Sequence, residues 1–253
     1  MYKNATCICS MSHQGNDLPE VWPKRFTKEN YDSFVIIDTS KDTSTTKGFL
    51  YNENSLREDL NFPHQVSNRH YWNSYGNRNI IWFYAHLRMM NFYLKYPNYD
   101  FYWFFDDDVK INDWNEFLTQ TDKNEDDFIS YIIFKKPGVE SQPNVPHMDN
   151  RTTSQHMWFE RFPGHTDTLP EDIKEYFGSF FPTTRYSNRS MKKLVELNNE
   201  GYFGYSEGFV PTVLNHYGMT LHTLIDSNNN SKLIDINNIK ILHKDTKIDW
   251  EWI

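Results

Sequence analysis

An apolar run that ends in three aspartates limits what this chain can fold into more than any other feature. The run FYWFF covers residues 101–105, and Asp106, Asp107 and Asp108 follow it directly. Aromatic side chains at this density are typical of a buried strand. Ligands of open α/β sheets bind in the crevice at the carboxyl ends of the strands. The sequence therefore predicts an α/β sheet with a group of carboxylates at that edge.

The surrounding segments predict a mixed, mainly parallel sheet flanked by helices. A strand over 5–10, a short helix within 18–26 and a strand over 31–40 give a parallel strand–helix–strand start. A helix that begins near Asn77 or Asn79 and stops before Pro97 should be buried, because its apolar residues lie nearly all round it. Beyond it we expect strands over 126–134 and near 239–243, a strand or extended piece over 179–187, helices over 189–199 and within 201–219, and an irregular segment at 135–169. We expect one large domain, residues 1–253.

The charge balance excludes two classes of partner. The net charge of −8 disfavours nucleic acid, which needs a basic face, and strong adsorption to anionic lipid. One basic cluster contains Arg185, Arg189, Lys192 and Lys193. We interpret it as a solvated helix face, and the alternative is a docking site for an anionic acceptor.

Cysteine usage and hydropathy predict a cytoplasmic protein. Cys7 and Cys9 alternate along a strand, so both point to one face and cannot form a comfortable disulfide. Small buried thiols of this kind suit a reducing compartment. The sequence also has no uninterrupted apolar leader, and we expect no transmembrane segment.

The aspartates are candidate metal ligands. Asp106 and Asp108 are two residues apart, so a strand end or turn can direct both carboxylates at one ion. Hard oxygen ligands together with a diphosphate are what Mg²⁺ or Mn²⁺ prefers, and the metal would neutralise a departing nucleoside diphosphate. A solvated acidic turn is the alternative interpretation.

Glu207 is the candidate general base. It lies in the segment YSEGF, where Ser206 can begin a helix and Gly204 and Gly208 leave room for a ligand. A carboxylate there can accept a proton from a sugar hydroxyl. The alternative is a glutamate that only stabilises the first turn of its helix through the helix dipole.

Four further positions complete the candidate site. His243 follows a predicted strand and could complete a metal shell, and Lys247 could meet phosphate. Asp38 ends the second strand, where it could hydrogen-bond a base or ribose. Arg78 opens the buried helix, whose N-terminus favours phosphate. Asp38 and Arg78 could equally be a cap or a surface charge, and His243 could be one of ten histidines near the surface.

The order of these motifs resembles the GT-A superfamily of nucleotide-diphospho-sugar transferases, and more vaguely its bacterial members in surface-glycan assembly. The segment FFDDDVKI resembles the metal motif, FGSFFP with Gly178 the glycine-containing loop, YSEGF the acidic helix start, and ILHK the late metal-binding histidine. The chain departs from the pattern at Gly208, where a second acidic residue is usual. The resemblance implies a nucleotide-sugar-binding half at about 1–111 and an acceptor-binding and catalytic half at about 112–253. It places Asp106, Asp107 and Gly178 at the donor and Asp106, Asp108 and His243 at the metal.

The expected activity is metal-dependent, inverting transfer of a sugar from a nucleotide-diphosphate donor, most simply a UDP-sugar, to a glycan or lipid-linked acceptor. The alternatives are a HAD-like phosphatase that uses the aspartate triplet, and an inactive sugar- or nucleotide-binding module. The phosphatase motif has Thr or Val where this chain has Lys110, and a calcium-binding EF-hand loop would need an oxygen ligand there.

Overall fold

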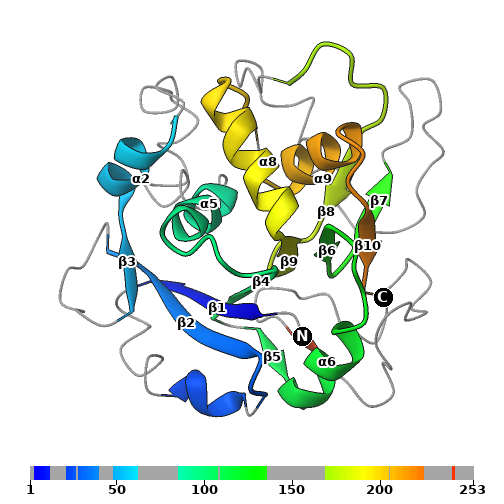
Figure 1. Cartoon of the computed structure of the whole chain (residues 1–253). Helices are drawn as coiled ribbons and strands as arrows, with labels where there is room; N and C mark the ends of the chain where they lie inside the picture. Colours follow the sequence, from blue (N-terminus) through cyan, green and yellow to red (C-terminus); the bar gives the residue numbers. More distant parts are fainter. Residues whose placement is uncertain are drawn as a thin grey trace, which may run out of the picture.

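The computed structural model describes residues 3–11, 21–26, 28–39, 48–61, 85–107, 109–135, 169–204, 206–224 and 241–242. A seven-stranded mixed sheet runs through this part of the chain (Figure 1). Its order is β10-β6-β9-β4-β1-β2-β3. The strands are β1 (Asn4–Met11), β2 (Tyr31–Asp38), β3 (Phe49–Tyr51), β4 (Phe101–Asp106), β6 (Phe128–Ser130), β9 (Thr183–Ser187) and β10 (Leu221–Thr223).

Parallel pairing dominates the sheet, as the sequence predicts. Strands β4, β1, β2 and β3 are successively parallel, and β10 is parallel to β6. Strand β9 lies between β4 and β6 and is antiparallel to both. The α/β class with a mainly parallel mixed sheet is therefore confirmed.

Helices cover both faces of the sheet, because alternate residues of its strands enter two separate cores. On one face, β1 contributes Cys7 and Cys9, and on the other it contributes Ile8. The first core packs against α2 (Glu53–Asp59), α5 (Ala85–Lys95), α8 (Asn188–Asn199) and α9 (Ser206–His216). The second packs against Trp22 beside the 3-10 turn η1 (Pro23–Arg25) and against α6 (Trp114–Thr121). Figure 1 shows the two groups on opposite sides of the sheet.

Several helix ends follow from local sequence. In α2 the Asn52 side chain accepts the Ser55 N–H while the Ser55 hydroxyl accepts the Asn52 N–H, which is a reciprocal cap. Asp113 caps α6 in the same position. Helix α5 ends at Lys95, two residues before Pro97, and its buried residues lie on most of its circumference, as predicted.

Two short antiparallel pairs extend the architecture. Strand β5 (Lys110–Ile111) pairs with β11 (Ile241–Leu242), with Leu242 opposite Lys110. Strand β7 (Ile133–Lys135) pairs with β8 (Phe177–Ser179). The predicted single strand over 126–134 and the predicted strand or extended piece over 179–187 are therefore wrong in their extent. Each is divided between two sheets.

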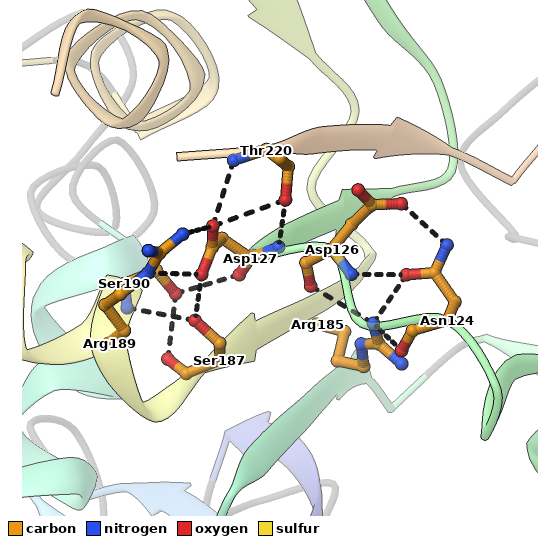
Figure 2. A network of polar contacts seen from close by, with 8 residues as sticks. All are labelled: Asn124, Asp126, Asp127, Arg185, Ser187, Arg189, Ser190 and Thr220. Atoms are coloured by element: carbon orange, nitrogen blue, oxygen red, sulfur yellow. Dashed lines mark hydrogen bonds and ion pairs between the residues drawn. The ribbon is translucent and has the colours of Figure 1, made fainter. Parts of the chain in front are cut away.

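The interpretation of the basic cluster as a solvated helix face is wrong for Arg185. This residue lies in β9 and is 2% exposed. Its guanidinium donates to the carbonyls of Thr121, Asn124 and Asp126 and to the Asn124 side chain at 2.8–3.2 Å. Figure 2 shows the bonds to Asn124 and Asp126. Its charge also lies 4.3 Å from the centre of the Phe101 ring. Arg185 therefore holds the turn between α6 and β6.

Arg189, at the start of α8, has a mixed role. Its side chain is 64% exposed, but it forms an ion pair with the buried carboxylate of Asp127. Asp127 also accepts the Ser187 hydroxyl at 2.8 Å and the Thr220 N–H at 3.0 Å (Figure 2). This one carboxylate connects β9, α8 and β10 to the start of β6.

The described helices include none that is both long and apolar enough to cross a membrane. Cys7 and Cys9 are free thiols and both are buried in the same core, as predicted.

Candidate functional site

The carboxyl ends of four parallel strands meet at one edge of the sheet. Asp38 ends β2 and is opposite Tyr51 of β3, while Asp106 ends β4 and is opposite Cys9 of β1. The prediction that both aspartates lie at strand ends is confirmed. With strands about 4.8 Å apart, Asp38 and Asp106 lie about 10–12 Å from each other. Their spacing suits contacts to different parts of one ligand.

Arg88 of α5 reaches this edge and holds Asp106. Its Nη2 lies 2.6 Å from Asp106 Oδ1, and the two side chains are 12% and 24% exposed. Burial opposes the charge on the guanidinium, but the Asp106 carboxylate helps to keep the pKa of Arg88 above its ordinary range. Burial also raises the pKa of the neighbouring Cys9 thiol to about 12, so Cys9 is a neutral neighbour. Arg88 thus fixes the direction of the first aspartate.

The backbone around the aspartates is fixed on both sides. The Asp106 N–H donates to the Pro182 carbonyl at 2.9 Å, and the Asp107 N–H donates to the Cys9 carbonyl at 3.1 Å. The Val109 N–H closes the turn on the Asp106 carbonyl at 3.0 Å. The aspartate turn is therefore anchored to β1 and to the residue before β9.

Glu207, in the first turn of α9, contacts the chain next to Pro182. Its Oε1 accepts the Phe181 N–H at 3.2 Å, and Phe181 precedes Pro182, which holds Asp106. Ser206, the first residue of α9, contacts His86 of α5, with 2.8 Å between its Oγ and the imidazole Nδ1. Burial lowers the pKa of His86 to about 3, so this imidazole is neutral. The structure therefore brings Glu207 close to the end of β4.

The β5–β11 pair brings a third segment to this edge. Leu242 directly precedes His243, and its partner Lys110 lies two residues after Asp108. Asp108, His243, Arg78 and Lys247 themselves lie outside the described residues, so their predicted roles remain predictions.

Of the three predicted metal ligands, only Asp106 lies within the described residues. Asp106 offers carboxylate oxygens at a partly exposed position, and such oxygens are what Mg²⁺ and Mn²⁺ prefer. Within the described ranges no group of three or more histidine, cysteine or acidic side chains could hold a metal. Two of the three predicted ligands, Asp108 and His243, fall in the gaps between those ranges.

The prediction that Gly178 belongs to a loop is wrong. Gly178 lies in β8 opposite Phe134, and a Cβ atom added to it would lie 2.2 Å from the Phe134 ring. The absence of a side chain makes room for this ring, which explains the glycine by packing.

Sequence reasoning missed the roles of Arg88 and of the backbone groups of Phe181 and Pro182. Arg88 interrupts an apolar run, and a charge in the buried part of a helix is a signal for a paired, functional charge. The role of Phe181 and Pro182 depends on backbone groups, which have no sequence signature.

Neither known family models nor curated proteins match the chain.

Proposed function

We propose that this protein is a metal-dependent glycosyltransferase of the GT-A type that uses a nucleotide-sugar donor. The proposal depends on one observation, the convergence of three distant segments at the carboxyl edge of the sheet. The aspartate turn after β4, Glu207 of α9 and the chain just before His243 all contact β4, β5 or the Phe181–Pro182 segment. A single motif of this kind would be weak support, but three that meet at one ligand-binding edge are stronger.

The proposed chemistry divides the site between leaving group and nucleophile. A divalent cation, Mn²⁺ or Mg²⁺, held by Asp106, Asp108 and His243 would neutralise the leaving diphosphate. Glu207 would accept the proton of the acceptor hydroxyl. A carboxylate can accept about four hydrogen bonds, so the bond from Phe181 does not exhaust its capacity. Attack opposite the leaving group would invert the anomeric carbon.

Partners and location follow from this chemistry as parts of the same proposal. Asp38 would contact the base or ribose, at the far end of the edge from Asp106. The acceptor would be a glycan or a lipid-linked sugar. Two buried free thiols suit a reducing compartment such as the cytoplasm, where nucleotide sugars are made.

The first test is metal-dependent binding of UDP, measured by calorimetry with Mn²⁺ and with chelator. We expect binding only with Mn²⁺, and we expect Asp106→Asn to weaken it at least tenfold. Asp100→Asn is the matched control, because Asp100 lies at the other end of the same strand and is exposed. UDP affinity that does not change with metal would contradict the proposed site. A panel of other nucleotides under the same conditions identifies the donor.

The second test concerns Glu207. Glu207→Gln should lower turnover by about 10²–10⁴-fold with little change in donor affinity, which is the usual worth of a general base. Glu116→Gln is the control, because Glu116 also lies in the first turn of a helix but is exposed on α6. Near-normal turnover in Glu207→Gln would show that this residue only stabilises its helix. Retained anomeric configuration in the product would exclude inversion.

A further inference from the structure

A proline leaves one carbonyl of α9 without its helical partner. Pro211 is the sixth residue of α9 and is buried. In a regular helix the N–H of residue 211 would donate to the carbonyl of residue 207, but proline has no N–H. The carbonyl that loses its helical partner therefore belongs to Glu207, the proposed base.

Ser179 supplies a hydrogen bond to this carbonyl from outside the helix. Its Oγ donates to the Glu207 carbonyl at 3.2 Å, and Ser179 is fully buried in β8. A second bond of the same kind lies one turn further on. The Thr212 hydroxyl accepts the Phe177 N–H at 2.9 Å and contacts the Phe177 carbonyl at 3.2 Å. Helix α9 is thus fixed against β8 by hydrogen bonds as well as by packing.

The chain just after β8 also holds the Glu207 side chain, through the Phe181 N–H at 3.2 Å. Residues 177, 179 and 181 alternate along the chain, and each one contacts α9. Ser179 fixes the backbone of Glu207, and Phe181, two residues further along the chain, fixes its carboxylate.

We propose that Ser179 is a positioning residue for Glu207, because its hydroxyl links the backbone of this residue to β8. The bond from Ser179 to the Glu207 carbonyl fixes how far the first turn of α9 lies from β8. This places the carboxylate on the Phe181 amide, beside the aspartate turn. The inference rests on the proposed function for the catalytic role of Glu207, but not for the positioning itself.

A double-mutant cycle separates positioning from stability. Ser179→Ala is made in the natural chain and in a Pro211→Ala background, where the new N–H of residue 211 can donate to the Glu207 carbonyl along the helix. In the natural background Ser179→Ala removes the hydroxyl that donates to that carbonyl and should lower the melting temperature. In the Pro211→Ala background the same substitution should cost little stability. The hydrogen bond between β8 and the Glu207 carbonyl is lost in both backgrounds.

Two further measurements report on position. Hydrogen exchange of the Phe181 amide should rise about five- to tenfold on Ser179→Ala in both backgrounds, while the core amide of Ile129 should not change once global stability is taken into account. If the protein turns over a sugar donor, Ser179→Ala should lower kcat about tenfold in both backgrounds and leave KM nearly unchanged.

The outcomes separate the positioning role of Ser179 from the proposed catalytic function. The positioning role is refuted if Ser179→Ala leaves Phe181 exchange unchanged, or if exchange and kcat recover together with stability in the Pro211→Ala background. Absence of turnover by the natural protein with any donor would refute the proposed function alone, because Phe181 exchange would still decide whether Ser179 positions Glu207.

Discussion

Replacing Arg185 should destabilise the protein far more than replacing the other basic residues near it. Arg185→Met keeps the length of the side chain and removes the guanidinium that holds the turn between α6 and β6. The substitution leaves three backbone carbonyls and one side-chain oxygen without this donor.

The size of the effect follows from two opposing contributions. Hydrogen bonds that involve a charged group contribute about 1.5–3 kcal/mol each, so four give roughly 6–12 kcal/mol. Burial lowers the pKa of Arg185 to about 10, which corresponds to a cost of about 3 kcal/mol for keeping it charged inside. Residues 122–126 are partly or fully exposed, so water can replace part of the lost bonding. We therefore expect a net loss of about 3–4 kcal/mol.

Denaturant unfolding followed by circular dichroism measures this loss, and thermal unfolding should show a decrease of about 6–16 °C in the melting temperature. Arg185→Lys, which keeps the charge but not the planar fork, should lie between Arg185→Met and the natural protein. Lys192→Met, on the exposed part of α8, is the control and should change stability by less than about 0.5 kcal/mol. A loss below about 1 kcal/mol for Arg185→Met would refute the reasoning and support a solvated arginine.

Three other predictions concern acid stability, packing and the metal. Burial raises the pKa of Asp127, but hydrogen bonds from Arg189 and its neighbours lower it below 3.8 overall. The carboxylate therefore stabilises the folded protein above pH 3.8, and this stabilisation is lost as the pH falls through the folded pKa. Between about pH 4 and pH 2, urea titrations of Asp127→Asn should show a smaller loss of unfolding free energy than those of the natural protein. Gly178→Ala should cost about 1–3 kcal/mol in the same assay, and Phe134→Ala should relieve part of that cost. His243→Ala should weaken Mn²⁺-dependent UDP binding at least tenfold in calorimetry, and unchanged binding would exclude it as a ligand.

Strands β1, β2 and β4 could be predicted because they are long. They have six to eight residues, and β2 and β4 are dense in β-branched or aromatic side chains. Strands β6, β9 and β10 have three to five residues, which is too short for a periodic signal. Pro182 separates β8 from β9. Because proline has no backbone N–H to donate to a neighbouring strand, it argues against one continuous strand through this position. Helix α2 could have been found from its Asn52 and Ser55 cap.

The candidate site could be predicted only where a side chain has a chemical signature. Asp106 and Glu207 stood out as carboxylates at element boundaries, and the structure brings their segments together. Arg185 was misread because a basic residue four positions before Arg189 fits a helix face equally well, and only strand pairing shows that it is buried. The contacts made by Phe181 and Pro182 depend on tertiary arrangement and leave no local pattern.

The position of β9 constrains the order in which the sheet can be completed during synthesis. Strand β6 has no direct pairing with β4, because β9 lies between them, and β9 begins at Thr183, more than fifty residues after β6 ends at Ser130. At a translation rate of about 5–20 residues per second, β6 must wait on the order of 3–10 s for its partner. During that time the edge of β4 is exposed to any other strand. A nascent chain stalled between Ser130 and Thr183 should therefore bind chaperones or aggregate more readily than one stalled after Ser187.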